Sequence, residues 1–121
     1  MNRMPPKRVL IVDDQPAFRH AARDLLTSRG HAVVGEADGL ISALAALEQH
    51  QPDAVLLDVC LGIESGFDVG RVLTGLRPGL SVLLASSDDR YGDDTRVREC
   101  GACGFVSKSR LVDADLGALW R

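Results

Sequence analysis

Four short apolar runs in this chain each lead directly into side chains suited to phosphate chemistry. Those side chains are, in chain order, Asp13 with Asp14, then Asp58, Ser86 and Lys108. If the runs form neighbouring parallel strands, their carboxyl ends open onto one edge of the sheet, which is where ligands of such sheets bind. Three carboxylates, a hydroxyl and an ammonium would then meet in one crevice. That group is a candidate magnesium and phosphoryl site.

The three aspartates predict a bound divalent cation. Asp13, Asp14 and Asp58 would repel one another at neutral pH if they lay close together, and a cation relieves that repulsion. Mg²⁺ suits such a site because it prefers hard oxygen ligands and joins one or two carboxylates to a phosphate oxygen. Asp58 stands alone after its apolar run, so it is the best candidate for a nucleophile that becomes an acyl phosphate.

Lys108 and Ser86 can serve the phosphoryl group itself. Phosphoryl transfer depends mainly on positioning and charge neutralisation, because charge spreads over the three equatorial oxygens. Lys108 can neutralise one oxygen as a point charge, and the Ser86 hydroxyl with nearby backbone N–H groups can bond another. Each residue of the group therefore has a separate predicted task.

The elements that must position these residues alternate between apolar runs and segments with helical spacing. Nearly unbroken apolar runs are typical of strands that are buried on both faces. The alternation of five strands and five helices predicts a doubly wound α/β fold with a parallel sheet. The expected strands cover residues 9–12, 32–35, 54–58, 82–85 and 105–107. The expected helices cover residues 16–29, 40–50, 66–76 and 109–120, with a further brief helix that ends near residue 100. Ser109 is the expected cap of the last helix.

Length and composition limit the class of protein. The 121 residues with 45% hydrophobic content suffice for one domain with a single core, expected at about residues 8–120, and we expect no output domain in this chain. The net charge of −3 indicates neither direct nucleic-acid binding nor a basic membrane-binding face. No apolar run is long enough for a membrane span or signal peptide. Three cysteines fit a reducing compartment, so we expect a cytoplasmic protein.

The chain resembles the receiver domains of bacterial two-component response regulators. The family pattern is an acidic pair after the first strand, a phosphorylated Asp after the third, Thr or Ser after the fourth and Lys after the fifth. The resemblance runs from about residue 9 to residue 120, and the segments that carry it are VLIVDDQPAFR, VLLDVCLGIESG, VLLAS and GACGFVSKS. It implies a flavodoxin-like (βα)5 three-layer sandwich whose five-stranded parallel sheet has the order 2-1-3-4-5.

The resemblance also implies how the metal and the phosphoryl group are held. Asp58 would be the phosphoacceptor, and Asp14 and Asp58 would ligate Mg²⁺ directly. Asp13 would act largely through water, and the backbone carbonyl of Cys60 would be a further ligand. The implied phosphodonor is a sensor histidine kinase or a phosphotransfer protein, which makes the chain a signalling phosphoacceptor and not an enzyme.

A switch is implied as well. Phe105 matches the aromatic position whose ring turns inward as the Ser86 equivalent moves toward the phosphoryl group. Phosphorylation would then select one arrangement of the fourth helix, fifth strand and fifth helix. That face is the expected surface for partners, including a second copy of the chain in a homodimer.

The sequence departs from the family pattern at two positions. Gly62 stands where Pro is usual, four residues after the phosphoacceptor, and should loosen that loop. Ser109 follows Lys108 where a cis Pro is common, and this form resembles regulators with helix-turn-helix output domains. Cys60 and Asp88 occupy positions that tune phosphoryl lifetime in the family, so that lifetime is not carried over.

Three other interpretations remain. An aspartate-nucleophile phosphatase resembling the haloacid dehalogenases would carry a second Asp two residues after the nucleophile, but Cys60 stands there. A pseudo-receiver that binds partners without phosphorylation would lack a site residue, and none is missing. Cys100 and Cys103 form a Cys-x-x-Cys, but it precedes a strand instead of opening a helix, so packing at a turn is preferred over a redox pair.

Overall fold

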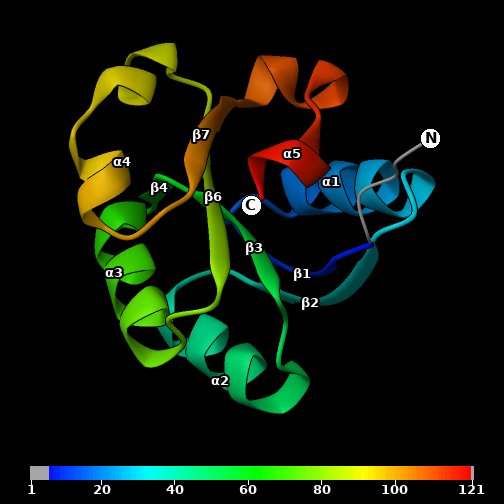
Figure 1. Ribbon diagram of the computed structural model, residues 1–121, viewed down its shortest axis with the longest axis horizontal. Helices are drawn as coiled ribbons and strands as arrows, with labels where there is room; N and C mark the ends of the chain where they lie inside the picture. Colours follow the sequence, from blue (N-terminus) through cyan, green and yellow to red (C-terminus); the bar gives the residue numbers. More distant parts are fainter. Residues whose placement is uncertain (1–5, 121) are drawn as a thin grey trace.

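Five parallel strands form the central sheet of the computed structural model, which describes residues 6–120 (Figure 1). The order across the sheet is β2-β1-β3-β6-β7, which counts as 2-1-3-4-5 among the strands of this sheet and confirms the predicted topology. Residues 1–5 and 121 of the expected single domain lie outside the described residues. The five strands are β1 (Arg8–Val12), β2 (Ala32–Ala37), β3 (Ala54–Asp58), β6 (Ser81–Ser86) and β7 (Gly104–Ser107).

The register of the sheet aligns the carboxyl ends of the strands. Val12 of β1 lies beside Leu57 of β3, the next residue along β3 is Asp58, and Ser86 of β6 lies beside Ser107 of β7. Every residue of β3 is buried, as its unbroken apolar run predicts for a central strand covered on both faces. The polar residues that follow these strands therefore collect at one edge.

Helices cover both faces of the sheet. α2 (Leu40–His50) and α3 (Gly66–Leu76) lie on one side, and α1 (Pro16–Ser28) and α5 (Leu116–Leu119) lie on the other (Figure 1). Strand side chains alternate between the two faces, so Leu10 joins the core under α2 and α3 while its neighbour Ile11 joins the core under α1. The sheet thus separates two apolar cores, as a three-layer sandwich requires.

Local signals mark the ends of α1 and the start of α3. Pro16 occupies the first position of α1, and Gly30, with φ +87°, follows its end. The hydroxyl of Ser65 accepts a hydrogen bond from the Phe67 N–H and caps α3. The polar stretch after β6 forms a 3-10 segment, η1 (Asp89–Asp93), and leads to the brief predicted helix, α4 (Arg96–Glu99).

The last predicted helix is wrong. Residues 109–120 form a 3-10 segment, η2 (Lys108–Asp113), and then the single turn of α5. Ser109 caps nothing, since its hydroxyl pairs with that of Ser107 at 2.9 Å. Asp115 caps α5 instead, because its carboxylate accepts from the Ala118 N–H.

The interruption of this segment changes which side chains are buried. A continuous helix over residues 109–120 would place Val112, Leu116, Leu119 and Trp120 on one apolar face. Val112 is instead 60% exposed, whereas Leu116 and Trp120 are buried. The Trp120 indole N–H donates to the Val55 carbonyl of β3 at 3.0 Å, and Arg29 at the end of α1 donates to the carbonyls of Val112 and Ala114. Tertiary contacts therefore position this segment more than helical periodicity does.

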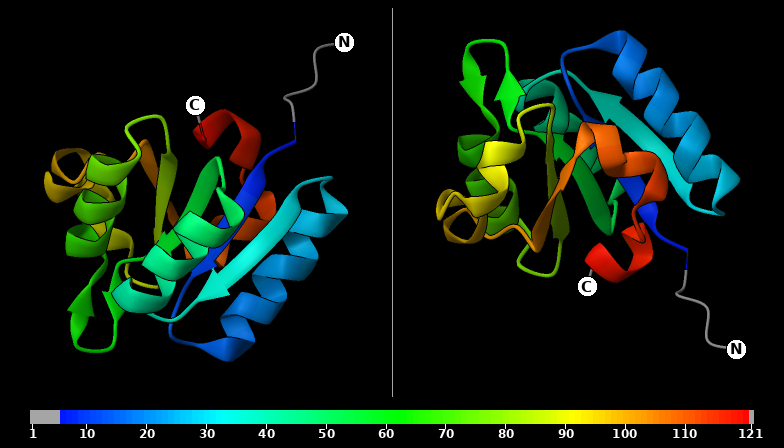
Figure 2. Two further views of the ribbon diagram at one scale, coloured as in Figure 1. Left: turned by 90° about the horizontal axis from the view of Figure 1, so that it is seen from below. Right: turned by 90° about the horizontal axis from the view of Figure 1, so that it is seen from above.

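A small hairpin after β3 was not predicted. It consists of β4 (Cys60–Leu61) and β5 (Glu64–Ser65), and it projects beyond the end of β3 (Figure 2). Gly62 in its turn has φ +65°, which the ring of Pro excludes. The Gly at this position therefore makes a tight turn, not simply a looser loop.

Gly66 closes this loop against the end of β3. A Cβ atom at this position would lie 2.0 Å from the Asp58 carbonyl oxygen, so only glycine allows the start of α3 to pack here.

None of the helices among residues 6–120 has the length and apolar character to span a bilayer.

Candidate functional site

The carboxyl edge of the sheet brings together the predicted acidic residues. Asp13 and Asp14 follow β1, and Asp58 is the last residue of β3. One carboxylate oxygen from each lies within 4.8 Å of the others. The structure thus brings these three carboxylates together at one edge of the sheet, as the sequence predicts.

Lys108 bridges two of the carboxylates. Its ammonium lies 2.7 Å from Asp13 Oδ2 and 3.3 Å from Asp58 Oδ2, and its side chain is only 11% exposed. The ammonium also lies 4.1 Å from the centroid of the Phe18 ring in α1. Lys108 is therefore held at the site from three directions.

Asp58 is buried at the end of β3 and has few compensating contacts. Its Oδ1 accepts a hydrogen bond from the Cys60 N–H at 3.3 Å, and its Oδ2 accepts one from Lys108. Burial of the carboxyl, together with the negative charge of Asp13, raises the pKa of Asp58 to about 6, although Lys108 and the Cys60 N–H act in the opposite direction. Additional positive charge near Asp58 would therefore stabilise its ionised form.

Asp13 is fixed by backbone contacts. Its Oδ1 accepts from the Gln15 N–H at 2.8 Å, and its own carbonyl accepts from the Arg19 guanidinium at 2.6 Å. Its Oδ2 is buried and lies 2.7 Å from the Lys108 ammonium, which compensates its charge in this arrangement. A buried carboxylate oxygen of this kind is suited to a metal ligand.

The donor set as a whole fits a hard divalent cation. Three carboxylates are close enough for one ion to contact all of them, and Asp14 is exposed to solvent, from which an ion could enter. Gly62 lies opposite Asp14, and a Cβ at this position would lie 3.7 Å from Asp14 Oδ2. Cys60, whose carbonyl is the remaining predicted ligand, begins β4 directly beyond the site, and its role as a ligand stays a prediction.

Ser86 and Phe105 lie at the same edge but do not touch the acidic group in this arrangement. Ser86 ends β6, is buried, and its hydroxyl accepts from the Asp88 N–H at 3.0 Å. The half-buried Phe105 ring packs against the core under α2 and α3, and a Cβ at Gly92 would lie 3.3 Å from it. Their predicted switch roles stay predictions.

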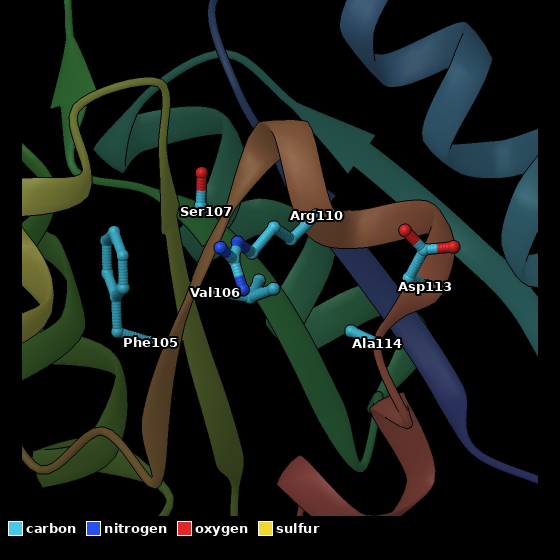
Figure 3. A pocket seen from close by; sticks show the side chains of 6 residues that line it. All are labelled: Phe105, Val106, Ser107, Arg110, Asp113 and Ala114. Atoms are coloured by element: carbon cyan, nitrogen blue, oxygen red, sulfur yellow. The ribbon is translucent and has the colours of Figure 1, made fainter.

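A pocket beside Phe105 lies along β7. It has a volume of about 380 Å³ and is lined by Phe105, Val106, Ser107, Arg110, Asp113 and Ala114. Figure 3 shows the Phe105 ring and the Val106 side chain on opposite sides of the strand. The pocket adjoins the site along β7, but its lining includes none of the three aspartates.

Two contacts of the site were missed in the sequence. Phe18 belongs to the apolar face of α1, and its contact with Lys108 depends on how that helix packs on the sheet. Arg19 bridges the Asp13 carbonyl and the Glu36 carboxylate. Neither contact has a local signal in the sequence.

The surroundings of the cysteine pair disfavour thiolate formation. Burial raises the pKa of the Cys100 thiol, which opposes formation of a reactive thiolate. The Cys103 thiol donates to the Val82 carbonyl at 3.2 Å, and both cysteines are free. These contacts support the packing interpretation.

Comparisons with known proteins agree with this geometry. The family model described as the response regulator receiver domain matches residues 9–115. Over 101 residues the chain is 38% identical to a putative transcriptional regulator of Pseudomonas aeruginosa, a match that covers 84% of this chain and 49% of that relative. Over 112 residues it is 30% identical to chemotaxis protein CheY of Thermotoga maritima, a match that covers 89% of this chain and 93% of that relative.

A solved structure shares the architecture. The crystal structure of a response regulator protein from Burkholderia pseudomallei, with a phosphorylated aspartic acid, calcium ion and citrate, has a TM-score of 0.82 and 26% identity to this chain. The match covers 93% of this chain and 66% of that protein. The chain spans about half the length of the curated transcriptional regulators that it matches. Sequence, fold and site together show that the chain belongs to the family of response regulator receiver domains.

Proposed function

We propose that this receiver domain accepts a phosphoryl group on Asp58 in an Mg²⁺-dependent step of a two-component phosphorelay. The observation that carries the proposal is the position of the Lys108 ammonium, 2.7 Å from Asp13 and 3.3 Å from Asp58 at the edge where three carboxylates meet. Lys108 places one positive charge against two buried carboxylates. It is suited to neutralise charge that arrives with a phosphoryl group.

The proposed donor is a phosphohistidine of a sensor kinase or phosphotransfer protein. An ionised oxygen of Asp58 attacks phosphorus in line, a new P–O bond forms, and the P–N bond to the imidazole breaks. The imidazole keeps the electron pair and takes a proton from water. Lys108 stabilises negative charge on a phosphoryl oxygen, while the Cys60 N–H is positioned beside Asp58 Oδ1 to donate to the acceptor carboxyl.

Asp13, Asp14 and Asp58, with the carbonyl of Cys60, would hold Mg²⁺. The proximity of the three carboxylates supports this assignment. When bound, Mg²⁺ supplies charge neutralisation for the carboxylates and for a phosphoryl oxygen. Because burial and Asp13 raise the pKa of Asp58, a nearby cation also keeps the nucleophile ionised at neutral pH.

The proposed output passes through Ser86 and Phe105. In the described arrangement the Ser86 hydroxyl is held by the Asp88 N–H, so binding a phosphoryl oxygen requires it to turn from the loop toward Asp58. Movement of Ser86 would bias the adjoining Phe105 ring and the face built from α4, β7 and η2 with α5. That face is the proposed surface for partners and for a homodimer, with no direct nucleic-acid contact by this domain.

The alternatives have less support. A phosphatase needs a general acid near the nucleophile, and the Cys60 thiol at that position lies 3.9 Å from the Tyr91 hydroxyl, with no second carboxylate in its place. A pseudo-receiver would lack part of the acidic group or the lysine, and both are assembled. We therefore propose a cytoplasmic signalling phosphoacceptor that acts as one domain over residues 1–121.

Incubation with Mg²⁺ and a small acyl-phosphate donor, followed by intact mass measurement, tests this proposal. We expect one phosphate adduct on the wild-type protein, its loss when the metal is chelated, and no adduct on Asp58→Asn. Asp58→Asn is the matched control because it keeps the side-chain shape and removes the nucleophile. An adduct that persists in Asp58→Asn, or a wild-type protein that accepts no phosphate, would contradict the proposal.

A further inference from the structure

We propose that the Phe18 ring positions the Lys108 ammonium for phosphoryl transfer, an inference that rests on the function proposed above. The ammonium lies 4.1 Å from the centroid of this ring. The face of an aromatic ring carries partial negative charge and attracts a cation placed over it. Phe18 is thus a positioning residue that acts through Lys108 and not through the phosphoryl group.

The ring completes a set of three contacts around the ammonium. Asp13 Oδ2 lies 2.7 Å away and Asp58 Oδ2 lies 3.3 Å away, and the side chain of Lys108 is 11% exposed. A lysine ammonium is a compact charge on a flexible four-carbon stem and lacks the fixed fork of arginine. Its position is therefore set by what surrounds it, and the ring is the uncharged part of that surrounding.

The ring contact differs from the two ionic contacts because phosphorylation and metal binding do not change the charge of the ring. Asp58 loses its negative oxygen when it becomes an acyl phosphate, and a cation at the acidic group competes with Lys108 for Asp13. Phe18 carries no charge that either event changes. The ring contact therefore persists from the free site to the phosphorylated site and keeps the ammonium over Asp58.

The start of α1 fixes where this ring lies. Pro16 occupies the first position of the helix, which places Phe18 in its first turn. Arg19 donates to the Asp13 carbonyl at 2.6 Å and pairs with Glu36 at 3.1 Å, which ties this turn to the loop that carries the acidic pair. Phe18 also packs against the core under α1, so its ring has little freedom to leave Lys108.

Phe18→Leu and Phe18→Tyr form the test pair. Leucine keeps an apolar side chain but removes the ring face, whereas tyrosine keeps the ring. With acyl phosphate and saturating Mg²⁺, we expect Phe18→Leu to be phosphorylated about threefold to tenfold more slowly than wild type, and Phe18→Tyr to retain a rate near that of wild type. The matched control is Leu25→Ala, which weakens packing of the same helix against the same core two turns further on.

A second measurement reports the contact directly. The ε-methylene protons of Lys108 should show an upfield ring-current shift by NMR in wild type and in Phe18→Tyr. The shift should be absent in Phe18→Leu and retained in Leu25→Ala. A role in stability alone would change the melting temperature of these variants but would not sort them by the presence of a ring.

The outcomes separate this inference from the proposed function. A wild-type rate in Phe18→Leu overturns the inference and leaves the phosphoacceptor function in place, and so does an equal loss of rate in Phe18→Leu, Phe18→Tyr and Leu25→Ala. No adduct on the wild-type protein overturns both. If Phe18→Leu does not fold by circular dichroism, Phe18→Met takes its place and its rate is interpreted in the same way.

Discussion

Asp58 is a carboxyl group on which burial and local charge act together. Its side chain is buried, Asp13 lies nearby, and the one ammonium within reach is shared between the two. Burial and Asp13 raise the pKa of Asp58 to about 6, from 3.8 for an unperturbed carboxyl. The metal-free folded protein therefore binds a proton at Asp58 more tightly than the unfolded chain does.

The free energy of unfolding of the metal-free protein should accordingly depend on pH. Because the folded pKa lies above the unfolded one, the contribution of Asp58 to stability is full below about pH 4 and is lost as the pH rises through about 6. Asp58→Asn should remove this loss and be more stable than wild type at pH 7.5 by on the order of 2 kcal/mol. Urea unfolding in the presence of a chelator at pH 5 and pH 7.5 measures both effects. Parallel pH dependences in the two proteins would contradict the raised pKa.

At the scale of elements, the loop from β3 to α3 determines how β3 ends. Gly62 turns the hairpin with a positive φ, and Gly66 brings the start of α3 against the Asp58 carbonyl. A side chain at residue 66 would displace the backbone that carries Asp58, the proposed nucleophile. The loop is thus part of the positioning of Asp58.

Two glycines of α3 should respond to alanine in opposite ways. Gly66→Ala places a Cβ 2.0 Å from the Asp58 carbonyl oxygen and should destabilise the protein by roughly 3 kcal/mol. Gly75→Ala has no atom within 4 Å of its new Cβ and should stabilise it by roughly 0.5 to 1 kcal/mol through helix propensity. Urea denaturation measures the free energy of unfolding of both variants. A destabilised Gly75→Ala would show that the space around the new Cβ does not by itself determine the change in stability.

The elements also show what periodicity could and could not predict. The strands were predictable because burial on both faces requires unbroken apolar runs, and the acidic group followed because parallel strands share one carboxyl edge. The last helix was wrong because Asp115 offers a better cap than Ser109, and because contacts of Arg29 and Trp120 hold the segment.

Side-chain directions at the site were beyond the reach of sequence patterns. The spacing places Ser86 at the right strand end, but its hydroxyl direction depends on the Asp88 N–H of the following turn. Likewise, the Phe18 contact depends on how α1 packs on the sheet and on the conformation of the Lys108 stem. Both are tertiary properties, and no local pattern of residues encodes them.

At the scale of the whole molecule, the C-terminal segment closes the core under α1. Trp120 is fully buried, and its indole donates to the Val55 carbonyl in β3. It is the largest fully buried side chain among the described residues. The end of the described chain is therefore tied to the same strand that ends in Asp58.

Trp120→Phe should lower the free energy of unfolding by roughly 2 kcal/mol, because it removes the buried hydrogen bond to the Val55 carbonyl and creates a small cavity. Val112→Ala in the same segment should change it by no more than about 0.5 kcal/mol, since Val112 is 60% exposed. Equilibrium urea unfolding of both variants measures the difference. Comparable losses would indicate that the segment is held by helical packing after all.

The separation of the two cores by the sheet has a consequence for how such a protein can diversify. Neighbouring strand residues such as Leu10 and Ile11 belong to different cores, so a substitution in one core is shielded from the other. Each half can therefore drift under its own packing constraints. The carboxyl edge is the seam at which both halves contribute, with Phe18 packed against one core and Phe105 against the other. Substitutions at this edge must therefore satisfy the packing of both cores at once.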